Sequence, residues 1–233
     1  MPVKAIIFGS IGTLTETSDL QRRAFNAAFG EADLDWNWDA ETYRRMVADG
    51  ATGGHDRIAN YARSHGGPLT AAVVAQIHAR KSAIFQQSMA IGIPTNAGVA
   101  ETIAAARSAG VKLGFASSTS AANIDAMFAA TGPTLTPAMF DALSNSDTVA
   151  NGKPAPDVYV EILRRLGVDA ADAVAIEDTL QSAEASHAAG IVTLIVPGAI
   201  ARGQDFGGLP VAPSLAGFSL DDFAVLLERV PAE

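Results

Sequence analysis

Residues 5–14 read Ala-Ile-Ile-Phe-Gly-Ser-Ile-Gly-Thr-Leu, and this stretch decides the fold. Four apolar residues are followed at once by a turn with two glycines, which is typical of a short strand buried on both faces of a parallel sheet. Comparable apolar runs recur at 111–116, 173–176 and 192–196, each followed by small or acidic residues. We therefore expect four buried parallel strands.

Alanine-rich segments with helical spacing separate the expected strands. They lie at 99–108, 121–130, 156–166 and 180–189. The alternation of strand and helix predicts an α/β fold with a doubly wound, Rossmann-like parallel sheet.

One long region interrupts this alternation. From about residue 15 to residue 91 the sequence contains helical patterns and no convincing strand. We therefore expect an all-helical insertion at 16–91, after the first strand, with 1–15 and 92–233 forming the α/β core. The sequence Gly-Ile-Pro-Thr at 92–95 is typical of a hinge at the return to the core.

Composition excludes several classes of protein. Of the 233 residues, 48% are hydrophobic and 18% charged, which suits a chain with a substantial core. The net charge of −9 disfavours broad contact with nucleic acid or an anionic membrane. The lack of cysteine excludes disulfides, thiolate zinc sites and a cysteine nucleophile. The N-terminal apolar run is too short for a signal sequence or membrane span, so we expect a cytoplasmic protein.

Polar and charged residues follow the expected strands, at the edge where open α/β sheets bind ligands. In chain order they are Gly-Thr-Leu at 12–14, Ser117, Lys153 and the pair Glu177-Asp178. Their order and spacing resemble the motifs of haloacid dehalogenase-like (HAD) phosphatases. The runs at 24–29, 35–39 and 52–58 in the insertion resemble the helical cap of the CbbY branch, which is similar to β-phosphoglucomutase.

The resemblance implies a magnesium-dependent phosphatase of sugar phosphates, notably xylulose 1,5-bisphosphate. Family members attack phosphorus with the first aspartate of Phe-Asp-x-Asp-Gly-Thr-Leu and use the second as general acid and base. Those two positions are Gly9 and Ile11 here, and neither side chain can do this chemistry. Ser10 lies between them, where the pleat of a strand would aim it away from the site. Glu16 and Asp19 belong to the linker and are not in line with the site.

The resemblance also implies which residues hold ligands. Phosphate would be bound by Ser117, Lys153 and Arg57. Magnesium would be held by the carboxylates of Asp178 and Glu177 and the backbone carbonyl of Ile11. Because magnesium demands near-octahedral oxygen ligation and gives up water reluctantly, we expect only weak binding to this reduced set.

Each of these residues also has a plainer structural interpretation. Ser117 and Asp178 suit the N-cap of the helix that follows each of them, because both residue types are preferred there. Lys153 suits a solvated loop or an ion pair with Asp178. Two adjacent acids at one strand end are costly without a cation nearby, and this favours a bound ion or Lys153 beside them.

The insertion departs from the branch as well. Ser18 and Gln21 stand where a glutamate and a histidine are usual, and His55 stands in place of a lysine. His55, His65, His78 and His187 lack metal-ligand spacing, so we expect them on the surface or in packing contacts.

Three functional interpretations follow. The first is a catalytically impaired CbbY-type protein, or pseudoenzyme, that binds phosphate or a phosphorylated metabolite, as a monomer or small homo-oligomer. The second is an active magnesium-dependent phosphatase that works by a non-standard route. The third is an interaction protein with a vestigial pocket.

Overall fold

The structure, a computed structural model, describes residues 2–48 and 53–228. Its five-stranded sheet has the order β3-β2-β1-β4-β5, and every pair of neighbouring strands is parallel. The strands are β1 Ala5–Phe8, β2 Lys112–Ala116, β3 Ala142–Ser144, β4 Ala173–Glu177 and β5 Val192–Ile195. The predicted α/β fold is confirmed. The edge strand β3 was not predicted, because three residues are too few for a recognisable pattern.

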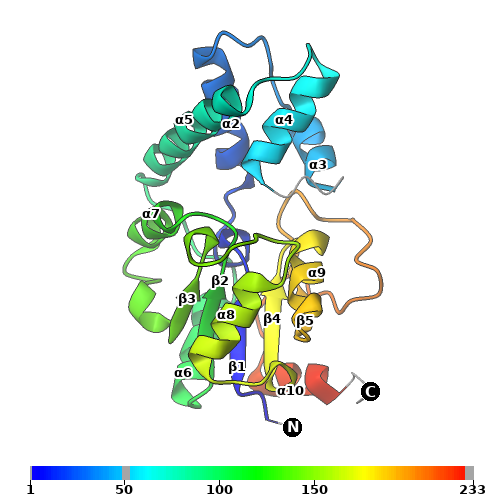
Figure 1. The fold of residues 1–233 in the computed structure, drawn as a ribbon. Helices are drawn as coiled ribbons and strands as arrows, with labels where there is room; N and C mark the ends of the chain where they lie inside the picture. The colour runs from blue at the N-terminus through cyan, green and yellow to red at the C-terminus, as the bar shows by residue number, and fades with distance from the viewer. Residues whose placement is uncertain (1, 49–52, 229–233) are drawn as a thin grey trace.

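Helices cover both faces of this sheet (Figure 1). They are α6 Val99–Ser108, α7 Ala121–Thr131, α8 Asp157–Leu166, α9 Leu180–Ala188 and α10 Leu220–Glu228, with short 3₁₀ turns η1 Pro137–Met139, η2 Ser146–Thr148 and η3 Ala170–Asp172. Side chains of β1 alternate between the faces: Ile6 and Phe8 pack with α6, α7 and α10, whereas Ala5 and Ile7 pack with α8 and α9. Because both faces of β1 are buried, every position of this strand must be apolar.

Four helices stand apart from the sheet, above the carboxyl ends of its strands (Figure 1). They are α2 Ser18–Glu31, α3 Ala40–Ala48, α4 Gly54–Ser64 and α5 Ala71–Met89, and we call them the cap helices. A short helix, α1 Ile11–Leu14, precedes them. The cap helices enclose a core of their own, in which the Trp38 side chain is fully buried against Phe25 and Phe29. The limits 16–91 for the insertion stay a prediction.

The strand register determines which residues meet below the cap helices. Phe8, the last residue of β1, pairs with Phe115 of β2 and Ile176 of β4. The Gly9 amide then donates to the Ile176 carbonyl at 3.0 Å, which brings Gly9 beside Glu177. Within the described ranges, no helix is long and apolar enough to cross a membrane.

Candidate functional site

A cavity of about 580 Å³ lies between the carboxyl ends of the strands and the cap helices. We call it the main cavity. Its lining combines the turn after β1, the loops after β2 and β4, and all four cap helices. The residues used below are Gly9, Ser10, Ile11, Ser18, Gln21, His55, Arg57, His78, Lys81, Ser117, Lys153 and Asp178. The sequence motifs at the strand ends and in the insertion therefore converge on one space.

The lining of the main cavity is cationic. Arg57, Lys81 and Lys153 line it together with two histidines, whereas Asp178 is the single carboxylate among its described lining residues. The whole chain nevertheless has a net charge of −9. A cationic concavity in an acidic protein concentrates field lines that attract anions.

Lys153 lies at the floor of the main cavity and forms a buried ion pair. Its Nζ donates to Glu177 Oε1 at 2.7 Å and to the Tyr159 hydroxyl at 2.9 Å. It also donates to the backbone carbonyl of Gly9. Both charged side chains are buried, at 5% and 0% exposure. The expectation that Lys153 pairs with Asp178 is wrong, because its ammonium pairs with the buried carboxylate of the adjacent Glu177 instead.

Burial dominates the electrostatics of Glu177. Desolvation raises its pKa to about 7, although Lys153 opposes the rise; the nearby Asp178 adds to it. Its Oε2 is buried and accepts no hydrogen bond from any residue that the structure describes. The pair therefore satisfies one carboxylate oxygen and leaves the other without a partner.

The space beside Gly9 is occupied. A Cβ added at Gly9 would overlap the carboxylate of Glu177 and the hydroxyl of Tyr159. The ion pair and its tyrosine thus fill the position from which a side chain at residue 9 would start. Any larger residue there must displace the Lys153–Glu177 pair.

We expect Gly9→Ala to lower the free energy of unfolding by about 1 to 3 kcal/mol, because the added methyl group overpacks a buried site. Gly30→Ala is the matched control. A Cβ at Gly30 meets nothing within 4 Å, so alanine in helix α2 should stabilise by about 0.5 to 1 kcal/mol. Urea unfolding measures the change in the free energy of unfolding for both variants. Equal changes would contradict the conclusion that the space beside Gly9 is occupied.

Ser10 lies in the main cavity, contrary to the expectation that it points away. The strand ends at Phe8, so its pleat no longer sets the direction of Ser10, which is the N-cap of α1. Its Oγ accepts from the Thr13 amide at 3.2 Å. Asp178 lies close to this hydroxyl, whose influence opposes the burial that raises the pKa of that carboxyl.

Asp178 is not the N-cap of the following helix, the structural role predicted as an alternative. The N-cap of α9 is Thr179, whose side chain accepts from the Ser182 amide. Asp178 instead lines the main cavity beside Ser10.

The residues expected to hold magnesium do not fit such an ion in this arrangement. The Ile11 carbonyl accepts from the Thr15 amide at 2.9 Å and from the Thr15 hydroxyl at 3.4 Å, so both of its lone pairs are engaged. Glu177 is committed to Lys153. In the part of the chain that the structure describes, no three histidine or acidic side chains gather as a metal site. Asp178 alone supplies too few oxygen ligands for magnesium, a hard cation that takes six.

Ser117 and Arg57 lie on opposite sides of the main cavity. Ser117 is 3% exposed, and its Oγ accepts from the Thr119 amide at 3.2 Å; the N-cap of α7 is Ser120. Arg57 donates from Nη1 to the Tyr43 hydroxyl at 3.1 Å, while its buried Nε has no hydrogen-bond partner among residues 2–48 and 53–228. Arg57 follows residues 49–52, so Thr52 of its motif lies outside the described residues.

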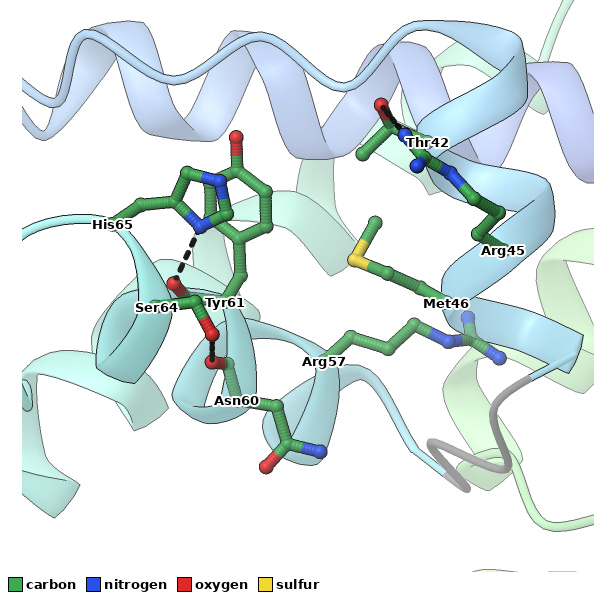
Figure 2. Close-up of a pocket in the computed structure, with 8 residues that line it drawn as sticks. All are labelled: Thr42, Arg45, Met46, Arg57, Asn60, Tyr61, Ser64 and His65. Atoms are coloured by element: carbon green, nitrogen blue, oxygen red, sulfur yellow. Dashed lines mark hydrogen bonds between the residues drawn. The ribbon is translucent and has the colours of Figure 1, made fainter.

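Arg57 also borders a second cavity of about 440 Å³, between α3 and α4, which we call the cap cavity (Figure 2). Figure 2 shows its aliphatic stem along one wall, below Met46. The rings of Tyr61 and His65 stack at 3.9 Å on another wall. None of the eight described residues that line the cap cavity is acidic.

Lys81 is the residue of the main cavity that sequence reasoning missed. It is 5% exposed, and its Nζ donates to Gln21 Oε1. A signal was present, since the buried residues of α5 are Val74, Ile77, Lys81, Phe85 and Met89, so this lysine lies on the apolar stripe of its helix.

His55 and His78 also line the main cavity, with ring centroids 4.0 Å apart. The expectation of surface or packing roles holds for both, since His55 is exposed and its ring packs on that of His78, but both residues also border the main cavity. It holds too for His187, which is exposed, and for His65, which stacks on Tyr61.

The model of the haloacid dehalogenase-like hydrolases matches residues 3–190. The chain is 39% identical over 225 residues to protein CbbY of Cereibacter sphaeroides, covering 96% of this chain and 94% of the relative. It is 38% identical over 220 residues to the plasmid CbbY of Cupriavidus necator, covering 91% and 86%. The chain therefore belongs to the haloacid dehalogenase-like hydrolases.

Within that family it falls in the branch of CbbY. Crystal structures of CbbY from Rhodobacter sphaeroides match it with a TM-score of 0.83 at 38% identity, over 92% of this chain and 95% of theirs. One of them is in complex with phosphate, and another, an aspartate-to-asparagine mutant, with xylulose 1,5-bisphosphate. The resemblance inferred from the strand-end motifs is confirmed.

Proposed function

We propose that this chain binds phosphate or a phosphorylated sugar in the main cavity and does not hydrolyse it by the family route. The cationic lining of that cavity in an acidic protein is the observation that carries the proposal. Ser117 offers one anion position at the sheet edge, where Lys153 can join it by exchanging one of its three hydrogen bonds for a phosphate oxygen. Arg57 and Lys81 offer another in the cap helices. Two such positions suit a molecule with two phosphate groups, such as the xylulose 1,5-bisphosphate bound to CbbY.

Loss of hydrolysis follows from Gly9 and Ile11. Breaking a catalytic unit of this kind costs about 10⁶-fold in rate, or about 8 kcal/mol of transition-state stabilisation. Lys153 and Ser117 can hold a phosphoryl group but cannot attack phosphorus. Arg57 and Lys81 do not replace the missing acid and base, because both lie on the cap helices.

Ser10 supports a second candidate function, a phosphatase that works by a non-standard route. Ser10 and Asp178 lie close together in the lining of the main cavity, and a carboxylate beside a serine hydroxyl is the pairing of base and nucleophile that activates a serine. Hydrolysis of p-nitrophenyl phosphate that is abolished in Ser10→Ala and in Asp178→Ala would establish this function in place of the first.

Binding is tested by thermal unfolding with inorganic phosphate. A ligand at 100 times its dissociation constant stabilises a protein by about 2.7 kcal/mol, so we expect a clear rise in Tm. Arg57→Met should remove most of the rise. Arg63→Met, in the same helix but outside the lining of the main cavity, should keep it. A Tm unchanged by phosphate or by sugar phosphates would contradict binding and favour an interaction protein.

Phosphatases of this family generally use magnesium, but no step of the proposed function depends on it. The weak magnesium site expected from Asp178, Glu177 and the Ile11 carbonyl is not part of the proposal, because Glu177 and that carbonyl already have other partners. The cytoplasmic location and the monomer or small homo-oligomer also stay predictions.

A further inference from the structure

We propose that Lys81 is the amine of a carbonyl-binding site, at which an aldehyde or ketone that carries a phosphate condenses to an imine. The proposal rests on the proposed function, because the cationic main cavity supplies the anchor for the phosphate. It adds a covalent mode of capture to the binding described above.

The surroundings of Lys81 hold its amine in a sheltered place that opens on the cavity. Its Nζ lies 4.7 Å from the ring centroid of Phe25 and 5.0 Å from that of Phe85. The side-chain carbonyl of Gln21 accepts its hydrogen bond. Phe25, Gln21 and Lys81 all belong to the lining of the main cavity. A carbonyl compound in the cavity can therefore reach the amine, while the rings limit access of water.

The charge state of Lys81 favours reaction with carbonyl carbon. Burial, assisted by the positive charge of Arg57, lowers its pKa to about 7. A substantial fraction of the amine is then neutral and nucleophilic near pH 7, as in lysines that form Schiff bases. The two aromatic rings favour the ammonium form and limit the fall.

The groups that face Lys81 are compatible with this chemistry. Helix α4 contributes Arg57 and His55, and α5 contributes His78, three residues before Lys81 on the same helix face. Burial and the nearby cations lower the pKa of His78 to about 4, so its imidazole is neutral at pH 7. Helix α2 contributes Gln21, which does not titrate.

The reaction is balanced without any further reagent. The neutral Nζ attacks the carbonyl carbon and becomes positively charged, while the carbonyl oxygen becomes an oxyanion. His78 takes one of the two Nζ protons and gives it to that oxygen, which yields a neutral carbinolamine. His78 then takes the second Nζ proton and gives it to the hydroxyl, which leaves as water as the C=N bond forms. The net change is the loss of one water molecule, with no oxidation or reduction.

The other lysines differ from Lys81 in their surroundings, so a reaction of Lys81 with a carbonyl compound can be distinguished from theirs. The chain contains four lysines in all. Lys153 is locked in its buried ion pair with Glu177. Lys4 and Lys112 are exposed and pair with Asp172 and Asp141, respectively.

The experiment treats the full chain at pH 7 with a small excess of pyridoxal 5′-phosphate, reduces it with borohydride, and maps the adducts by peptide mass spectrometry. We expect Lys81 to carry at least about tenfold more adduct than Lys112, because far more of its amine is neutral at this pH. Inorganic phosphate should compete, and pyridoxal without phosphate should label Lys81 less.

A Lys81→Arg variant is the matched control, because it keeps the charge and cannot form an imine. It should lose the adduct, whereas Lys112→Arg, outside the lining of the main cavity, should keep both the adduct on Lys81 and the rise in Tm with phosphate. If Lys81→Arg fails to fold, the unsubstituted protein still decides: labelling of Lys81 should rise with pH through about 7, and that of Lys112 only at much higher pH.

Three results would overturn the proposal. Equal labelling of Lys81 and Lys112 would show that the site has no special reactivity. No adduct on Lys81, with the phosphate-induced rise in Tm intact, would refute imine formation alone and leave the proposed function standing. Absence of both would refute both.

Discussion

Lys153→Met is expected to lower the free energy of unfolding by about 3 to 5 kcal/mol at pH 7 to 8, because it leaves the Glu177 carboxylate buried without its cation. Glu177 is 0% exposed, so water cannot replace the lost ammonium. The hydrogen bonds of Lys153 to Tyr159 and to the Gly9 carbonyl are lost as well. Chemical denaturation followed by circular dichroism measures the change.

The pH dependence of this variant has a definite sign. The pKa of Glu177 is already raised to about 7 by burial, and removal of Lys153 raises it further. Between the unfolded value near 4.5 and the folded value, the folded state holds a proton that the unfolded state has released. Stability of the variant therefore falls as pH rises through this window. The unsubstituted protein loses stability in the same way up to about pH 7, so the cost of the substitution grows mainly above pH 7 and is smaller near pH 5.

The double variant Lys153→Met, Glu177→Leu is the control. Replacement of both members of a buried ion pair by apolar residues is often nearly neutral, so much of the lost stability should return. A cost below about 1 kcal/mol for Lys153→Met, with no change between pH 5 and pH 8, would contradict the buried pair.

Lys81→Met is expected to have the opposite effect and to stabilise the protein at pH 7 by roughly 2 to 4 kcal/mol. The pKa of Lys81 falls from 10.5 to about 7 on folding. One pKa unit corresponds to about 1.4 kcal/mol, and the contacts with Phe25 and Phe85 offset part of the total. Methionine fills similar volume without a charge. Phosphate should raise the Tm of this variant less than that of the unsubstituted protein.

This gain depends on pH in a direction that can be checked. Between pH 7 and 10.5 the unfolded state holds a proton on Lys81 that the folded state lacks, so the unsubstituted protein gains stability as pH rises. The advantage of Lys81→Met should therefore shrink towards pH 10. The exposed Lys112→Met is the control and should show neither effect. If Lys81→Met were less stable than the unsubstituted protein at pH 7, burial of the Lys81 amine would not be unfavourable, and the lowered pKa would be contradicted.

The sequence was sufficient to predict the sheet, because strands buried on both faces must be apolar throughout, as in β1 and β4. Parallel strands end at one edge, so the residues after them, such as Ser117 and Asp178, had to come together. Strand β3 escaped prediction because its three residues have no distinctive period. The inserted helices were predicted from spacing, but how they cross was not, and this crossing turns His78 and Lys81 into the main cavity.

The details of the site depend on side-chain geometry that no motif records. Glu177 and Asp178 are adjacent in sequence, yet one is buried under Lys153 and the other lines the main cavity. Ser10 turns inward because β1 ends two residues before it. The sequence showed that Gly9 has no reactive group. It did not show that neighbouring side chains occupy the space where a side chain of residue 9 would lie.

Phosphorus NMR of the protein with xylulose 1,5-bisphosphate and magnesium, mixed at near-equal concentrations, tests the central claim that this CbbY-type protein binds without hydrolysing. We predict that the phosphorus signals of the ligand shift or broaden and that no inorganic phosphate forms. Lys153→Met, purified in the same way, controls for contaminating phosphatases and should leave the ligand signals sharp. A growing signal of inorganic phosphate in the unsubstituted protein that is absent with Lys153→Met would contradict the account.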